Sequence, residues 1–135
     1  MKFLSLKSLI VIAVTMFTVA SCSKKSEDAP PPPADPIIGT WVGTYRATNS
    51  PLVHDFVLAI KPAGILEILG ASDQVVATGT WKLDAGVFYG IYEYKNSNNV
   101  FNVAAKFDSE AGTLNGSYGD GKENPSDGDF EVVKQ

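Results

Sequence analysis

The sequence predicts an all-β domain, a single eight-stranded antiparallel up-and-down barrel over residues 37–135. Three observations predict it. Short segments of alternating apolar and polar residues recur along this region, and this is the period of a strand with one buried face. Most of the breaks between segments are two to five residues long, which suits antiparallel neighbours joined in chain order. No window of helical length has apolar residues at the spacing of an amphipathic helix.

Eight such segments follow one another, each bounded by residues that favour turns. They are residues 39–48, 52–61, 65–70, 75–83, 87–95, 100–107, 113–119 and 129–134. Strands joined in this order leave two exposed sheet edges unless the sheet closes. Closure into a barrel removes both edges, and a sandwich of two sheets is the alternative. A chain of about 99 residues is enough for one hydrophobic core and not for two.

The first three strands are marked by turns and by alternation. Strand 39–48 opens with Gly-Thr-Trp and is ended by Asn-Ser-Pro. Strand 52–61 places three large apolar residues on one face, and these are Phe56, Leu58 and Ile60. His54, the single histidine, shares that face by strict alternation. Strand 65–70 alternates in the same way between the turn sequences Lys-Pro-Ala-Gly and Ala-Ser-Asp.

The next two strands form a hairpin around the compact loop Asp-Ala-Gly. Strand 75–83 has Gly79, Trp81 and Leu83 on one face. Strand 87–95 has aromatic residues on both faces. Its outer aromatic surface is expected to be either Tyr92 with Tyr94, or Tyr89.

The last three strands alternate clearly, and the polar loop 120–128 separates the final two. The inward residues of strand 100–107 are expected to be Phe101, Val103, Ala105 and Phe107. Those of strands 113–119 and 129–134 are expected to be Leu114, Gly116, Tyr118, Phe130 and Val132.

The start of the first strand, Gly39-Thr40-Trp41, resembles the Gly-x-Trp signature of the calycins, the group of lipocalins, fatty-acid-binding proteins and avidins. The resemblance implies that Trp41 lies across the closed end of the barrel and plugs it. Larger lipocalins usually have a terminal helix and often a disulfide, and this chain lacks both. It is similar to the short lipocalin-like domains found on bacterial lipoproteins.

The opening segment has internal echoes. Residues 39–45, Gly-Thr-Trp-Val-Gly-Thr-Tyr, reappear as Gly-Thr-Leu-Asn-Gly-Ser-Tyr at 112–118, and Gly-Thr-Trp recurs at 79–81. The intervals are unequal, whereas a true repeat has one fixed period. We interpret the echoes as places where a strand begins to curve or crosses a curved region and requires the same kinds of residue.

The first 21 residues have the features of an export signal. Lys2 and Lys7 precede a run of about a dozen apolar residues, which is too short to span a bilayer. Val-Ala-Ser-Cys then resembles the lipobox of bacterial lipoproteins. This resemblance implies cleavage after Ser21 and lipidation of Cys22, the only cysteine, by diacylglycerol and a fatty acyl chain such as palmitate. Cys22 would thus anchor the chain to the cell envelope; an ordinary secretory signal is the alternative.

Residues 22–36 are predicted to be a spacer. They have no apolar periodicity, and the proline run favours an extended conformation of about 40 Å in total. Glu27 and Asp28 resemble the acidic tags that follow the anchor cysteine in surface-displayed lipoproteins, although Lys24 and Lys25 intervene. The expected location is therefore the outer membrane, on its cell surface or its periplasmic face.

Charge and composition exclude several classes of function. The 11 basic residues lose Lys2 and Lys7 with the signal, which leaves 9 against 15 acidic residues. An acidic domain without a basic patch argues against nucleic acid as a partner. One histidine and one cysteine, the latter used by lipid, exclude a zinc site and a nucleophilic triad. We expect no enzyme activity, no metal and no cofactor.

Acidic residues give only weak candidates for a site. The loop 120–129 contains oxygen ligands that suit calcium, but it does not match the EF-hand spacing and contains Lys122, so a solvated loop is the simpler interpretation. Glu67 and Glu93 lie on strands with apolar or aromatic neighbours. Both are expected on the outer face, although either could enter a cavity.

Aromatic residues give the strongest candidate for a binding site. Five of them share the predicted interior, and these are Tyr45, Phe56, Trp81, Phe101 and Tyr118. An eight-stranded barrel is either filled by its side chains or holds one small ligand. The first hypothesis is a binding module for a small apolar or aromatic molecule. The second is a filled barrel that contacts another envelope protein, with inhibition of a secreted protease as a special case.

Overall fold

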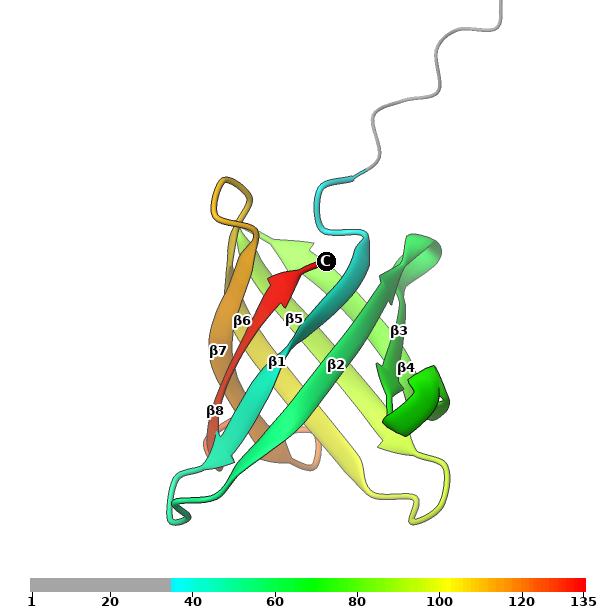
Figure 1. Ribbon diagram of the computed structural model, residues 1–135, viewed down its shortest axis with the longest axis vertical. Coiled ribbons are helices and arrows are strands. Elements are labelled where there is room, and N and C mark those ends of the chain that lie inside the picture. Colours follow the sequence, from blue (N-terminus) through cyan, green and yellow to red (C-terminus); the bar gives the residue numbers. More distant parts are fainter. Residues whose placement is uncertain (1–34) are drawn as a thin grey trace, which may run out of the picture. The chain divides into compact units, whose positions relative to one another are not determined.

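A computed structural model of the chain describes residues 35–135 and has the form of a closed barrel (Figure 1). Eight antiparallel strands pair in chain order, and the last closes on the first. They are β1 (Gly39–Ala47), β2 (Val53–Lys61), β3 (Ile65–Leu69), β4 (Val75–Asp84), β5 (Val87–Tyr94), β6 (Val100–Asp108), β7 (Thr113–Asp120) and β8 (Gly128–Lys134). Short 3-10 turns, η1 (Pro62–Gly64) and η2 (Ala71–Asp73), flank β3. The predicted signal, Cys22 and nearly all of the spacer lie outside the described residues.

The predicted fold class is confirmed, and the barrel is preferred over the sandwich because β8 pairs with β1 along seven register positions. Each strand begins and ends within one residue of the limits expected from the sequence. Within residues 35–135, no helix is long and apolar enough to cross a membrane.

The register places the predicted apolar faces inward. Trp41 lies opposite Leu58, and Val103 lies opposite Tyr118. The fully or nearly fully buried core includes Leu58, Ile60, Leu66, Phe88, Leu114 and Val132. In β5 the aromatic residue that faces outward is Tyr89, which is 40% exposed on the outer wall. Tyr92 and Tyr94 were the other candidates for the outer surface, and the structure turns them inward.

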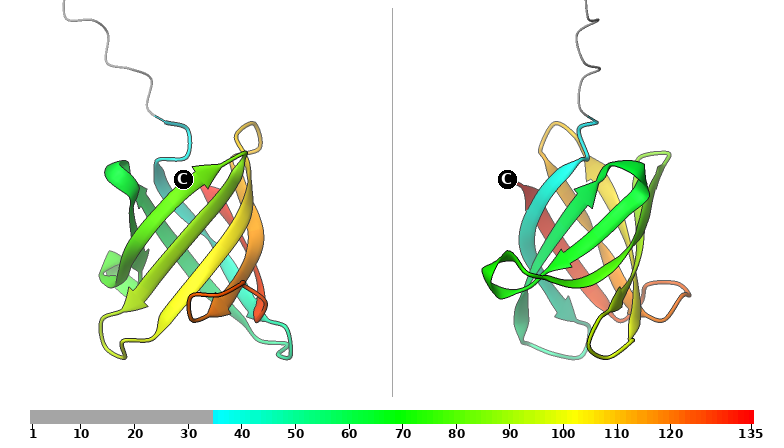
Figure 2. Two further views of the ribbon diagram at one scale, coloured as in Figure 1. Left: turned by 180° about the vertical axis from the view of Figure 1, so that it is seen from behind. Right: turned by 90° about the vertical axis from the view of Figure 1, so that its right-hand side faces the viewer.

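One end of the barrel is closed by residues at the start of the domain. Trp41 is fully buried, and its indole Nε1 donates a hydrogen bond of 2.9 Å to the carbonyl of Ile37, which is also fully buried. The ring of Phe107 meets Trp41 edge-on at 5.9 Å. Figures 1 and 2 show that the chain enters the barrel at this end and that the C-terminus lies there too. The opposite end is therefore the mouth.

Three glycines explain the echoes in the sequence. At Gly43, Gly79 and Gly116, a Cβ atom would lie 1.8–1.9 Å from a carbonyl oxygen of the neighbouring strand. No real side chain tolerates such a distance, so the strands can approach and bend there only without one. The repeated Gly-Thr and Gly-Ser steps therefore mark where the wall curves.

Candidate functional site at the mouth of the barrel

The mouth is walled by aromatic side chains from five strands. A small void of about 50 Å³ lies among them, lined by Tyr45, Phe56, Tyr92, Tyr94, Phe101 and Tyr118. Below the mouth the barrel is packed, with Phe56 against Phe130 at 5.4 Å and Trp81 stacked on Phe88 at 6.2 Å. The interior is thus filled rather than hollow.

The rings of the mouth hold one another in place. Tyr45 lies at the centre: it stacks on His54 at 5.1 Å and meets the ring of Tyr118 edge-on at 5.3 Å. Phe101 stacks on Tyr92 at 5.9 Å and meets Tyr94 edge-on at 5.6 Å. Offset and edge-on pairs of this kind add stability beyond the burial of their surface. The mouth is consequently a closely packed aromatic cup.

Four tyrosines bring polar groups to this cup. Among residues 35–135, the structure records no hydrogen bond from the hydroxyls of Tyr45, Tyr92, Tyr94 or Tyr118. Tyr92 is only 5% exposed as a residue, but its hydroxyl oxygen is not fully buried. These phenols therefore retain unused capacity for hydrogen bonds beside the void.

Burial and mutual proximity raise the pKa of three of these phenols. Burial raises the pKa of Tyr92 far above its usual value, with smaller contributions from the neighbouring tyrosines. Burial also raises the pKa of Tyr94, followed by the effect of Tyr45. The pKa of Tyr118 is raised by burial, then by Tyr45 and Asp127. At neutral pH each hydroxyl keeps its proton and can donate it in a hydrogen bond.

We expect the barrel to lose stability above about pH 10, where an unfolded tyrosine ionises. Below that pH the phenols are neutral in both states. Above it, the unfolded chain loses protons that folded Tyr92 retains, so the free energy of unfolding falls as pH rises. Chemical denaturation at pH values from about 8 to about 11 measures how steeply the free energy of unfolding falls with pH. Tyr92→Phe is expected to flatten this dependence, and equal slopes for the two proteins would contradict the assignment.

The structure brings together four of the five aromatic residues predicted to line a site. Tyr45, Phe56, Phe101 and Tyr118 line the void. Trp81 does not, because it lies in the half nearer the closed end, where its Nε1 donates a 2.8 Å hydrogen bond to the carbonyl of Lys61.

Sequence reasoning missed three members of the mouth: Tyr92, Tyr94 and His54. The short loop of the hairpin between β4 and β5 indicates the register that turns Tyr92 and Tyr94 inward. Asp84 pairs with Val87 around a two-residue loop, and this register places Tyr92 opposite the inward residue Gly79. His54 follows the alternation of its strand and lies at the exposed rim.

Acidic residues form no comparable site in the described part of the chain. Residues 35–135 contain no group of three or more His, Cys, Asp or Glu side chains placed to hold a metal ion. Glu67 is paired with Lys61 at 2.6 Å, and Glu93 is exposed on the outer wall.

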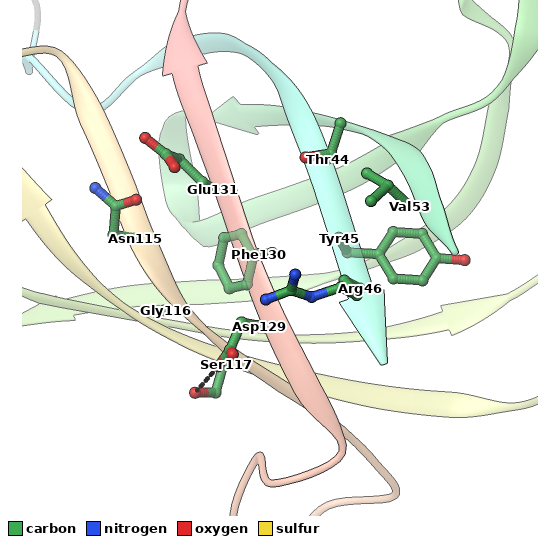
Figure 3. A pocket seen from close by; sticks show the side chains of 10 residues that line it. All are labelled: Thr44, Tyr45, Arg46, Val53, Asn115, Gly116, Ser117, Asp129, Phe130 and Glu131. Atoms are coloured by element: carbon green, nitrogen blue, oxygen red, sulfur yellow. Dashed lines mark hydrogen bonds between the residues drawn. The ribbon is translucent and has the colours of Figure 1, made fainter. Parts of the chain in front are cut away.

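A polar depression of about 450 Å³ lies on the outer wall, across β1, β7 and β8 (Figure 3). Its side chains include Arg46, Asn115, Asp129 and Glu131, and all four are exposed. The hydroxyl of Ser117 donates a hydrogen bond of 3.4 Å to Asp129. Because charges in open solvent bind weakly, this depression is a poorer candidate than the mouth.

No protein-family model matches the chain, and neither does a curated protein or a solved structure. The closed eight-stranded barrel is compatible with a lipocalin-like fold.

Proposed function

We propose that this protein is a lipid-anchored envelope protein and that its barrel is a non-catalytic binding module. Its ligand is a small apolar or aromatic molecule that enters the mouth. The observation that carries the proposal is the set of unpartnered tyrosine hydroxyls beside a void with aromatic walls. Such a site combines an apolar surface for a flat group with a few polar atoms that orient it, which is the usual make-up of a small-molecule site.

The size of the void restricts the ligand. A pocket that encloses a small molecule has a volume of roughly 300–1,000 Å³, whereas this void is about 50 Å³. A long lipid chain is therefore a poor candidate. Tyr45, Tyr94 and Tyr118 are partly exposed at the rim, and a group that enters there must separate their rings. We propose that one ring-sized group inserts among them while the rest of the ligand stays in solvent.

The entry point of the chain supports binding at a distance from the membrane. The described residues begin at Asp35, beside the closed end, where the backbone of Ile38 donates to the carbonyl of Asp35. The described chain therefore begins at the end of the domain opposite the mouth. An anchor at Cys22 would then tether the protein without covering its site.

A titration with indole or 4-hydroxybenzoate, followed by NMR, tests the mouth. We expect shifts at Tyr45, Tyr94 and Phe101, because these residues surround the inserted ring. Tyr118→Ala is expected to weaken binding by about tenfold. Tyr89→Ala is the matched control, since this tyrosine lies on the outer wall. Equal losses in the two variants, or shifts that avoid the mouth, would count against the proposal.

The filled interior favours a second candidate function, in which the mouth receives an aromatic side chain of another envelope protein. A packed barrel can present its rim as a rigid docking surface. Purification of cross-linked partners from envelope extracts distinguishes this role. A partner that is captured by the wild type and by Tyr89→Ala, but not by Tyr118→Ala, would favour it over a small molecule.

Lipidation is tested at Cys22. Cells that express the protein and grow with labelled palmitate are expected to label the wild type and not Cys22→Ala, which should also leave the membrane fraction. Ser23→Ala, next to the cleavage site, is the control and should retain the label. Undiminished label on the Cys22 variant would remove the anchor from the proposal.

A further inference from the structure

A second concave surface lies on the outer wall, away from the mouth. It is an open groove of about 420 Å³ over β4, β5 and β6, and the loop between β7 and β8 forms one end of it. We call it the wall groove. Its floor consists of Ile91, Asn102 and Ala104, and its far end of Lys82 and Tyr89. Its volume is in the range of sites that bind small molecules.

The first residue of the loop is bonded to the wall, while most of the loop is exposed. Gly121 donates a backbone hydrogen bond of 2.7 Å to the carbonyl of Val100 at the start of β6. Gly119 permits this contact, since a Cβ atom there would lie 2.8 Å from the Cα of Pro125. The loop is largely exposed, as the sequence predicts, and its residues 122–125 also line one end of the groove.

An unpartnered buried acceptor lies at the floor of the groove. Asn102 is only 7% exposed, and its Nδ2 donates a 3.0 Å hydrogen bond to the carbonyl of Gly121. Because a carbonyl can only accept, this bond fixes which amide atom is the nitrogen. The other atom, Oδ1, is buried without a partner. Such an acceptor costs about 1–3 kcal/mol until a donor reaches it.

The remaining lining indicates what kind of molecule supplies that donor. Tyr89, Ile91 and Pro125 offer an apolar surface, while Thr80 adds a hydroxyl. Lys82 and Lys122 place two positive charges beside the single carboxylate of Glu123, on a chain whose formal net charge is −4. An extended peptide cannot add here as a further strand, since the barrel is closed and β5 and β6 are already paired on both sides.

We propose that the wall groove binds an acidic saccharide unit, a sugar ring that carries a carboxylate. The apolar face of the ring lies on Ile91 and Pro125, since the Lys82 ammonium lies over the ring of Tyr89 at 5.3 Å. A ring hydroxyl donates to Asn102 Oδ1. The carboxylate lies between Lys82 and Lys122. Oδ1 is covered in the structure, so binding requires the exposed loop residues Lys122, Glu123 and Asn124 to move outward. This site is separate from the mouth and does not depend on the function proposed for it.

An NMR titration of the domain with galacturonate oligomers tests the proposal, with neutral galactose oligomers as the comparison ligand. We expect saturable shifts at Ile91, Asn102 and Ala104 with the acidic oligomers. The double variant Lys82→Gln with Lys122→Gln should weaken binding by about tenfold. Lys106→Gln removes the same charge from β6 outside the groove and should change nothing.

Asn102→Ala is an independent test of the role of the buried acceptor in saccharide binding. It removes the buried acceptor together with its amide donor, and it should abolish the shifts while thermal unfolding shows that the domain still folds. Tyr118→Ala should leave saccharide binding intact, which separates the groove from the mouth. Equal affinity for neutral oligomers, shifts confined to the mouth, or an ordered water on Oδ1 without any saccharide binding would each overturn the proposal.

Discussion

Gly79→Ala is expected to unfold the barrel or to leave it with little residual stability. A Cβ atom at this position would lie 1.8 Å from the carbonyl oxygen of Ile91 and 2.6 Å from the Cα of Tyr92. Both atoms belong to the backbone of β5, so neither can rotate aside as a side-chain tip does. The two strands must separate, and the ladder between β4 and β5 breaks at its middle.

We expect this change to cost about 3 kcal/mol or more, which is a large part of the stability of an ordinary domain. Denaturation followed by circular dichroism gives the free energy of unfolding. Thr78→Ala is the matched control, because Thr78 lies next in the same strand and its side chain is exposed. A midpoint for the glycine variant equal to that of the control would show that the wall can relax at this point.

Much of the fold could be predicted because strands with one buried face leave a strong imprint on sequence. Phe101, Val103 and Ala105 alternate with Asn102, Ala104 and Lys106, and a shift of one residue would expose all three inward residues. Turns rich in Gly, Asn, Asp and Pro then limit each strand. The eight strands, and the inward faces of all of them except β5, followed from these two signals.

The site was predicted only in part, and strand β5 shows why. Aromatic residues occupy both of its faces, so hydrophobicity alone leaves the register open; pairing with β4 resolves it and brings Tyr92 and Tyr94 into the mouth. Trp81 was assigned to the right face but lies at the wrong depth, since alternation gives the direction of a side chain and not its distance from either end of the barrel.

The wall groove could not be predicted from the residue pattern, for a different reason. Its floor residue Asn102 is polar and faces outward, so the sequence predicts a solvated side chain. Burial depends on the loop folding back over β6, and this in turn depends on the missing side chain of Gly119. Contacts between residues distant in sequence, such as Asn102 with Gly121, leave no periodic signal.

Trp41→Ala is expected to open the closed end of the barrel. The indole is fully buried, lies against Phe107 and has the ammonium of Lys134 at 6.0 Å from its ring. Its removal leaves a large cavity and also leaves the carbonyl of Ile37 without its donor. A change of this kind costs about 3–5 kcal/mol, to which the lost hydrogen bond contributes. Because Ile37 packs at the same end, the segment that joins the domain to its spacer should come loose as well.

Two measurements separate this role from that of an ordinary core residue. Chemical denaturation should show a larger loss for Trp41→Ala than for Trp81→Ala, since Trp81 is only partly buried and its hydrogen bond to Lys61 is exposed. Limited proteolysis of the folded protein should cut near Asp35–Ile38 in the Trp41 variant alone. Trp41→Phe keeps an apolar ring and should recover most of the stability. If Trp81→Ala were the more damaging change, the closed end would depend on the stacked pair Trp81–Phe88 instead.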